Sequence, residues 1–500
     1  MKKVALIGSG FSSLSAACYL AKAGYDVTVF EKNGSIGGRA QQLVKDGFKF
    51  DMGPSWYWMP DVFERFFADF DKTSTDFYSL EKLAPAYEIY FGTDDKLTVD
   101  DSLEAIAERF EAIEKGAGAK LMKFIEQAKE NYEIAIHDLV YKPGESLTEL
   151  VKLKTIKKIH QFASTISKDV RSQFKDDRLR KVLEFPALFL GAKASKTPSF
   201  YNFMNYADFG MGTWYPKGGM YSVVQGMFQL AISLGVDFKF YASVDMISVN
   251  EGTVDGIFVH GEYIPFDLVV SGADYAHTES LMPEQYRQYS KSYWNSKTYA
   301  PSSLLFYLGF DKKIPNMTHH SLFFDADFEK HAQAIYDRPS YPKDPLFYAS
   351  FPSINDETIA PKGKEAGVIL IPLAPGMNDD QVMIDSYFDQ VMDRLEAQCG
   401  TSIRDSIVFK KQFTISDFVK EYNSYKGNAY GMANTLFQTA ALRPKLKSKK
   451  LEGMFFTGQL TVPGPGVPPS LISGKLVADL VAKYHPLKKT KRNYSIAASL

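Results

Sequence analysis

The sequence predicts an α/β fold, and three observations lead there. An apolar run at 4–7 is followed at once by two glycines, as when a buried parallel strand enters a tight turn. Apolar residues then recur at helical spacing over 11–24, and a second apolar run at 26–30 completes a strand–helix–strand unit. The 500 residues, 45% hydrophobic and 23% charged, are enough for a second, α+β substrate-binding lobe beside this Rossmann-like domain.

Composition excludes several functional classes. The 58 Lys and Arg residues nearly cancel the 59 Asp and Glu residues, so a general nucleic-acid binder is not expected. The two cysteines, Cys18 and Cys399, are too few for a disulfide framework or a Cys-rich metal site, and a reducing cytosol suits them. No apolar stretch approaches the roughly 20 residues that a membrane-spanning helix needs.

The turn after the first strand has the residues of a dinucleotide site. Gly8 permits a sharp turn, Gly10 lets the backbone approach a pyrophosphate, and the helix N-terminus that follows favours negative charge. Glu31 ends the second strand, where a carboxylate can bind an adenosine ribose. Ser13 stands where a third glycine is usual, a position that serves helix–strand packing. The residues expected at the cofactor here are Gly8, Ser9, Gly10, Phe11, Ser12, Ser13, Glu31 and Lys32.

Two further glycine-rich segments extend this site. Gly37, Gly38 and Arg39 follow the second strand, and the arginine can donate charge-assisted hydrogen bonds to phosphate, although a surface ion pair is the alternative. Near the C-terminal end, a Pro/Gly segment at 461–470 leads into a helix and makes a second anion site. These motifs resemble the flavin amine oxidase and carotenoid desaturase superfamily, and the C-terminal segment is similar to that of bacterial phytoene desaturases.

The resemblance spans nearly the whole chain and implies FAD as the cofactor. It extends the expected cofactor-binding set to Gly38, Arg39, Gly53, Pro54, Ser55, Val244, Gly272, Gly458, Gln459, Gly466, Val467 and Pro468. It also suggests residues that line the substrate site, namely Trp214, Tyr215, His319, His320 and Asn428. No metal site is expected, because His319 and His320 lack the i,i+4 helical spacing of a zinc motif.

The FAD-binding domain is expected to be discontinuous. Its predicted pieces are 1–65, 215–285 and 445–485, the substrate-binding lobe takes 66–214 and 286–444, and 486–500 form a basic tail. Within the lobe, residues 151–181 hold ten Lys or Arg against three Asp or Glu, with apolar residues at near-helical spacing. A basic amphipathic helix at 145–182 can lie on a membrane surface, although a packed helix with a solvated basic face fits as well. This pattern suggests a cytoplasmic protein that is peripheral on the inner face of the cell membrane.

Aromatic residues are concentrated between 185 and 215. Nine occur there, against about four expected from the 14% average of the chain, and they suit either a channel wall or ordinary core. The resemblance implies hydride transfer from a C40 carotenoid precursor to flavin N5, from phytoene towards lycopene, with oxygen or a membrane quinone as electron acceptor. Glu149 and Asp208 are candidate bases for the proton that is lost, and a structural role is the alternative for each.

Other functions remain open at this point. A related carotenoid enzyme is one: a C30 diapophytoene desaturase, a hydroxycarotenoid 3,4-desaturase or a retinol-saturase-like enzyme. A flavin amine oxidase would bind a polar amine instead. A non-catalytic protein that binds FAD and carotenoid is the third alternative. The sequence makes no prediction of oligomeric state.

Overall fold

A five-stranded parallel sheet forms the centre of the nucleotide-binding part. The computed structural model describes residues 1–146, 149, 158–435 and 437–487. The strand order is β19-β13-β1-β2-β9, from strands β1 (Lys3–Ile7), β2 (Asp26–Phe30), β9 (Asp237–Lys239), β13 (Leu268–Ser271) and β19 (Met454–Phe456). Residues 4–7 of β1 are all buried because β1 pairs in parallel with β2 and β13, one on each side. This sheet therefore joins segments that lie far apart in the chain.

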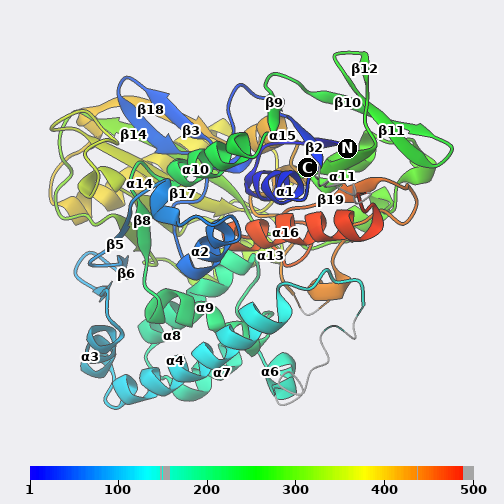
Figure 1. Ribbon diagram of the computed structural model, residues 1–500. Helices are drawn as coiled ribbons and strands as arrows, with labels where there is room; N and C mark the ends of the chain where they lie inside the picture. Colours follow the sequence, from blue (N-terminus) through cyan, green and yellow to red (C-terminus); the bar gives the residue numbers. More distant parts are fainter. Residues whose placement is uncertain (147–148, 150–157, 436, 488–500) are drawn as a thin grey trace, which may run out of the picture.

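Three long helices pack beside the sheet. They are α1 (Phe11–Lys22), α10 (Met220–Ser233) and α16 (Val467–Tyr484), and α1 contacts both of the others. Figure 1 shows α1 and α16, blue and red, side by side although they come from opposite ends of the sequence. A Cβ atom on Gly474 would come within 2.5 Å of the Ser12 carbonyl oxygen, so the glycine allows the close approach of these two helices.

Smaller sheets complete this part of the chain. An antiparallel sheet contains β10 (Val244–Asn250), β11 (Thr253–Val259) and β12 (Glu262–Pro265). Two-stranded pairs are formed by β3 (Gln42–Lys45) with β4 (Phe48–Asp51), and by β5 (Leu80–Lys82) with β8 (Trp214–Pro216).

A seven-stranded mixed sheet forms the second lobe, in the order β18-β14-β17-β16-β15-β6-β7. Its strands are β6 (Tyr87–Tyr90), β7 (Lys96–Val99), β14 (Ser302–Phe310), β15 (His320–Phe323), β16 (Phe347–Ser350), β17 (Glu365–Leu373) and β18 (Ile407–Phe413). Every residue of β14 is buried, because this strand pairs on both edges and carries core on both faces. Neighbouring strands are antiparallel except β15 and β6, which are parallel.

The remaining helices connect or cover these sheets. They include α2 (Pro60–Ala68), α11 (Tyr275–Ser280), α12 (Lys291–Asn295), α13 (Phe328–Tyr336), α14 (Gln381–Cys399) and α15 (Ile415–Tyr422). Short 3₁₀ turns are η1 (Gly38–Ala40), η2 (Ser74–Asp76), η8 (Glu284–Tyr286), η9 (Pro352–Ile354), η10 (Arg404–Ser406), η11 (Tyr425–Gly427) and η12 (Ala440–Leu442).

A helical region lies at the lower end of the molecule in Figure 1. Its helices are α3 (Leu103–Ile113), α4 (Ala117–Ile134), α6 (Ile159–Ala163), α7 (Ile166–Gln173), α8 (Asp177–Glu184) and α9 (Phe203–Asn205). The 3₁₀ helices η5 (Phe185–Leu190) and η6 (Ser199–Asn202) lie between them, and π-helical turns are η3 (Ala135–Leu139) and η7 (Tyr206–Gly210).

The basic segment predicted as one amphipathic helix is interrupted where the structure describes it. Helix α6 ends at Ala163, and Thr165 begins α7 by accepting a hydrogen bond from the Lys168 backbone N–H at 3.3 Å. Residues 147–148 and 150–157, and most of the predicted basic tail, lie outside the described residues. No helix in the described part of the chain is long and apolar enough to cross a membrane.

The predicted fold class is confirmed in its main features, a Rossmann-like parallel sheet and a second lobe that contains both strands and helices. The strands of the parallel sheet come from 1–65, 215–285 and 445–485. The domain boundaries remain a prediction.

Candidate functional site

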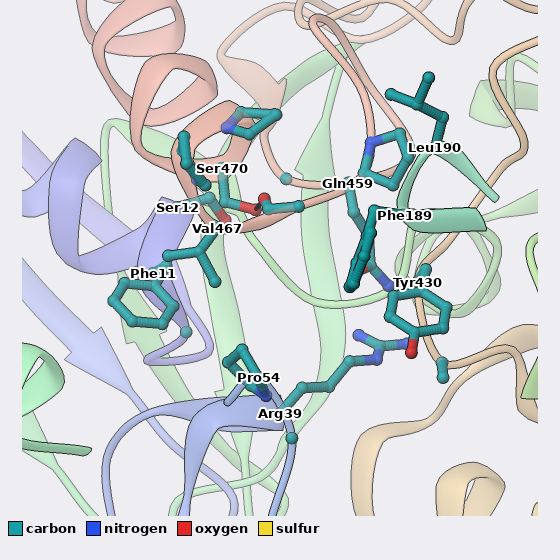
Figure 2. A pocket seen from close by; sticks show the side chains of 18 of the residues that line it. Phe11, Ser12, Arg39, Pro54, Phe189, Leu190, Tyr430, Gln459, Val467 and Ser470 are labelled. Carbon is teal, nitrogen blue, oxygen red and sulfur yellow. Dashed lines mark hydrogen bonds between the residues drawn. The ribbon is translucent and has the colours of Figure 1, made fainter. Parts of the chain in front are cut away.

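A large cavity lies between the two lobes. Its volume is about 790 Å³, and it begins at the carboxyl ends of β1, β2 and β13, where Ile7, Phe30 and Gly272 line it. The first residues of α1 and α16 also line the cavity, and Figure 2 shows Ser12 beside Val467 and Ser470. Ligands of open α/β sheets bind in this position, beyond the carboxyl ends of the strands.

The glycine turn after β1 leaves the backbone open to the cavity. Gly8 has a φ of +89°, which only glycine adopts without strain, and its N–H donates to the Phe30 carbonyl at 2.8 Å. Gly10 caps α1 with an ordinary φ of −72°. A Cβ atom at Gly10 would meet only the Gly37 carbonyl oxygen, at 3.9 Å. Gly10 is therefore not needed for the fold itself; it keeps space free for a ligand.

Glu31 is buried at the edge of this cavity. Its Oε2 accepts hydrogen bonds from the Ser9 backbone N–H at 2.9 Å and from Ser9 Oγ at 2.6 Å. Its Oε1 accepts from the Asn33 backbone N–H at 2.9 Å. Oε1 keeps a further lone pair, so Glu31 is held in place and can still accept a ribose hydroxyl.

Ser13 serves packing and not ligand binding. It is fully buried and does not line the cavity. A Cβ atom on Gly272 would lie 2.0 Å from Ser13 Oγ, so the serine fits because its neighbour at the end of β13 is glycine. The prediction that Ser13 contacts the cofactor is therefore not matched by its position. The remaining cofactor-binding predictions all line the cavity: Gly8, Ser9, Gly10, Phe11, Ser12, Glu31, Lys32, Gly38, Arg39, Gly53, Pro54, Ser55, Val244, Gly272, Gly458, Gln459, Gly466, Val467 and Pro468.

Arg39 brings a half-buried positive charge to the cavity. Its Nη2 donates to Ser424 Oγ at 2.9 Å and to the Asn428 carbonyl at 3.4 Å. Burial lowers the pKa of the guanidinium, and the nearby Asp274 carboxylate opposes that shift. A guanidinium in the cavity wall, two helix N-termini and an open glycine turn fit the pyrophosphate of a dinucleotide.

Sequence reasoning missed several polar residues of the same cavity. Tyr422, Tyr430 and Asn434 line it, and they come from the segment that follows β18. The signal that could have found Tyr430 is its place beside Asn428 in a segment with two glycines, Gly427 and Gly431; Tyr422 and Asn434 carry no comparable signal. They reach the site because the mixed sheet turns the chain back towards the nucleotide-binding part.

The other part of the cavity is apolar. Five of the nine aromatic residues between 185 and 215 line it, namely Phe185, Phe189, Phe200, Tyr201 and Phe203. Trp56, Trp58 and residues of α13 and β16 line it too. About half of this aromatic cluster therefore lies where the channel-wall interpretation expects it.

The five residues predicted to line the substrate site lie behind the wall instead. Trp214 Nε1 donates to the Met211 carbonyl at 2.9 Å. Tyr215 donates to Asp356 at 3.1 Å and packs edge-on against His319. Asn428 closes its own turn, donating to the Tyr425 carbonyl at 2.7 Å. None of the residues Trp214, Tyr215, His319, His320 and Asn428 lines the described cavity.

His320 lies behind the cavity wall and contacts side chains that form it. Its ring stacks on Trp56 with centroids 4.2 Å apart, and its Nδ1 lies 2.6 Å from the Tyr348 hydroxyl. That hydroxyl is 2.9 Å from Ser55 Oγ, and Ser55, Trp56 and Tyr348 all line the cavity. Burial holds the pKa of His320 well below its usual range, so the ring is a neutral support for these side chains.

The two predicted bases differ in position. Glu149 lines the cavity, and its carboxylate accepts from the backbone N–H groups of Gly144, Glu145 and Ser146 at 2.9–3.2 Å. Asp208 is buried behind the wall, where it accepts a 2.6 Å hydrogen bond from the Tyr87 hydroxyl. The Tyr87 ring packs edge-on against Trp56, so Asp208 contacts the cavity only through two other side chains.

Asp208 should make the stability of the protein depend on pH. Burial raises the pKa of this carboxyl to about 8, so the folded protein keeps a proton that the unfolded chain releases above pH ~4. Stability contributed by Asp208 is greatest below pH ~4 and falls by about 1.4 kcal/mol per pH unit up to pH ~8. We expect Asp208→Asn, which mimics the neutral acid, to remove this decline in a series of melting curves from pH 5 to 9.

The exposed Asp389 on α14 supplies the matched control, Asp389→Asn. The difference in melting temperature between this variant and the wild type should be the same at every pH. If the melting temperature of Asp208→Asn also differed from that of the wild type by the same amount at every pH, Asp208 would be ionised in the folded protein.

Comparison with known proteins identifies the family. Residues 11–482 match the family model of flavin containing amine oxidoreductases. The chain is 41% identical over 480 residues to a carotenoid 3,4-desaturase of Haloarcula japonica, covering 95% of this chain and 97% of that protein. It is 33% identical over 497 residues to a 4,4'-diapophytoene desaturase (4,4'-diaponeurosporene-forming) of Staphylococcus haemolyticus, covering 95% and 98%.

Solved structures agree on the fold. An oxidoreductase from Methanosarcina mazei has a TM-score of 0.62 at 17% identity and covers 95% of this chain and 100% of its own. A putrescine oxidase bound to putrescine has a TM-score of 0.57 at 14% identity, with 96% and 99% covered. The family model and the sequence relatives place the chain in the carotenoid desaturase family of the flavin-containing amine oxidoreductase superfamily, and it is an FAD-dependent carotenoid desaturase.

Proposed function

We propose that the chain desaturates an acyclic C40 polyene, with phytoene as substrate and products on the way to lycopene. The observation that supports this most is the continuity of the cavity, in which the dinucleotide cradle and the aromatic arm form one space. A polyene offers almost no polar groups, so its binding depends on apolar contact, worth about 25 cal/mol per Å². Phe185, Phe189 and Trp56 provide such contact next to Ser55 and Pro54.

The residues of the cavity hold the substrate and keep water out. Bound FAD supplies the hydride acceptor for the reaction. Trp56, fixed between His320 and Tyr87, presents a rigid aromatic face to the chain of the polyene. Rigid apolar walls favour one alignment of a flexible substrate, and alignment is worth several orders of magnitude in rate.

The carbon skeleton must also lose a proton as the double bond forms. Of the two carboxylates predicted as bases, Glu149 is the one that faces the cavity, so we keep it as the candidate acceptor. Its three backbone partners fix its orientation. Oxygen or a membrane quinone remains the expected electron acceptor.

A second candidate is desaturation at the 3,4 position of a C40 carotenoid. The 41% identity to the carotenoid 3,4-desaturase favours it over the C30 reaction, since the diapophytoene desaturases are 32–33% identical. Both C40 reactions use an acyclic chain that enters the cavity end-on. They differ in the end group that must sit beside the cofactor.

Product analysis distinguishes these substrates. The FAD-loaded protein is incubated with vesicles that contain phytoene, diapophytoene or a hydroxylated acyclic C40 carotenoid, and the pigments are separated by chromatography. We expect phytoene to yield products with longer-wavelength absorption. Turnover of the hydroxylated carotenoid alone would establish the second candidate, and turnover of diapophytoene alone would overturn both.

The cavity should open towards a membrane surface at 437–442. Phe437 is 79% exposed and Leu442 is 46% exposed, and Leu442 also lines the cavity. Gly144 lies against Ala440 and Ala441, which places Lys142 of the cavity wall in the same region. Apolar side chains beside a cation suit the interface of an anionic bilayer.

Changing Phe437 and Leu442 together to serine should weaken binding to anionic vesicles about tenfold, because their apolar area is no longer buried in lipid. Sedimentation with phosphatidylglycerol vesicles measures the effect. Val382, 78% exposed at the start of α14, gives the control Val382→Ser. If the double variant and Val382→Ser bind the vesicles equally well, the membrane contact lies elsewhere on the protein.

A further inference from the structure

Arg443 is among the largest fully buried side chains, at 1% exposure. All of its guanidinium donors have partners. Nε donates to the Thr461 carbonyl at 2.8 Å, Nη1 to Asn434 Oδ1 at 2.7 Å and to the Gln438 carbonyl at 3.0 Å. Nη2 donates to the Met432 carbonyl at 3.0 Å and to the Gln459 carbonyl at 2.7 Å.

These hydrogen bonds join two segments of the cavity wall. Asn434 lies on one segment and Gln459 on the other, and both line the cavity. With its amide oxygen turned to Arg39, Gln459 accepts from Nη1 and Nη2 of that residue at 3.1 Å each, while its amide nitrogen donates to the Tyr430 carbonyl at 3.2 Å. Figure 2 shows Arg39, Gln459 and Tyr430 together at the cavity. Gln459 is thus held between the guanidinium groups of Arg39 and Arg443, of which only the second is fully buried.

The positive charge of Arg443 has no nearby negative partner. Among the described residues no carboxylate lies within 4.0 Å of its guanidinium, and all five of its partners are neutral oxygens. Arg39 differs, since Asp274 lies near enough to oppose its charge. A buried charge without a counter-ion is costly, and five hydrogen bonds to neutral oxygens leave the charge of Arg443 uncompensated.

We propose that Arg443 is a positioning residue that also raises the reduction potential of the bound FAD. Hydride transfer adds two electrons and one proton to the flavin, so the cofactor gains one negative charge. The carbon that loses the hydride becomes positive and releases its neighbouring proton as the double bond forms. A fixed cation behind Gln459 stabilises the added negative charge in a cavity that excludes water.

This proposal rests on the flavin site of the family and not on the identity of the polyene. The test therefore measures the reduction potential by equilibration with a reference dye in the absence of carotenoid. Arg443→Gln should lower the equilibrium constant for flavin reduction at least about tenfold, which equals about 30 mV for a two-electron couple. Arg443→Lys keeps the charge, so its equilibrium constant for flavin reduction should stay within about threefold of the wild-type value. Its melting temperature can fall, because lysine has fewer hydrogen-bond donors.

Arg287 provides the matched control. Its guanidinium also donates to main-chain carbonyls, those of Met282 and Ser280, but neither of these two residues lines the cavity, whereas Asn434 and Gln459 do. Arg287→Gln should leave the potential unchanged. Equal shifts for Arg443→Gln and Arg443→Lys, or an unchanged potential with a lower Tm in both, would mean that Arg443 only braces the loops and would overturn the proposal.

A third variant covers the case in which Arg443→Gln fails to retain FAD. Arg443→His carries a charge that can be titrated, so its potential should fall with rising pH more steeply than that of the wild type. The same pH slope in both proteins would contradict an electrostatic role. Neither measurement requires turnover of a polyene, so a wrong substrate assignment does not affect the result.

Discussion

Gly10→Val should give a folded protein that has lost its FAD. The Cβ atom at this position has only the Gly37 carbonyl oxygen within 4 Å, and the φ of −72° suits any residue, so the fold should tolerate valine. The added methyl groups would instead occupy the space that the glycine turn leaves to the pyrophosphate. We expect the Kd for FAD to rise at least about a thousandfold, or about 4 kcal/mol.

Flavin absorbance after purification and a titration with FAD measure this loss, and circular dichroism tests the fold. Gly92→Val is the matched control, because a Cβ there has open space and the residue does not line the cavity. A Gly10→Val protein that is yellow and binds FAD like the wild type would refute the cofactor site.

Ala332→Trp should block the apolar arm of the cavity and leave the cofactor in place. Ala332 lies on α13 and faces the cavity together with Phe328 and Ile335. The helix cannot easily yield, because Lys193 forms ion pairs with Glu329 at 3.1 Å and Asp337 at 2.6 Å. We expect turnover of the polyene to fall about a hundredfold, since a displaced substrate carbon no longer meets the cofactor.

The neighbouring Gln333 is exposed on the same helix, so Gln333→Trp tests for an effect of the added indole alone. Both variants should keep a full complement of FAD and similar melting temperatures. Normal turnover by Ala332→Trp would show that the substrate does not enter beside α13.

The nucleotide half of the site could be predicted because its residues are close in sequence. Gly8, Gly10 and Glu31 belong to one strand–helix–strand unit, and local geometry decides which atoms face the ligand. Ser13 shows the limit of that reasoning. Its position depends on Gly272, more than 250 residues away, which the motif does not include.

The substrate half was harder to predict for the same physical reason. Tyr430 and Asn434 reach the cavity through long-range packing of the mixed sheet, and no short pattern encodes it. His320 and Tyr215 looked like lining residues, but a buried aromatic or histidine serves equally well one layer behind the wall. The apolar spacing over the basic segment likewise did not reveal the break between α6 and α7, where the side chain of Thr165 caps the start of the second helix.

Anaerobic mixing of the FAD-loaded protein with phytoene in vesicles tests the central claim most directly, because it follows cofactor and substrate together. We expect the absorbance of oxidised flavin to disappear while one new double bond forms for each flavin that is reduced. Flavin that stays oxidised with phytoene and with every other carotenoid, yet is bleached by a soluble amine such as putrescine, would contradict the account.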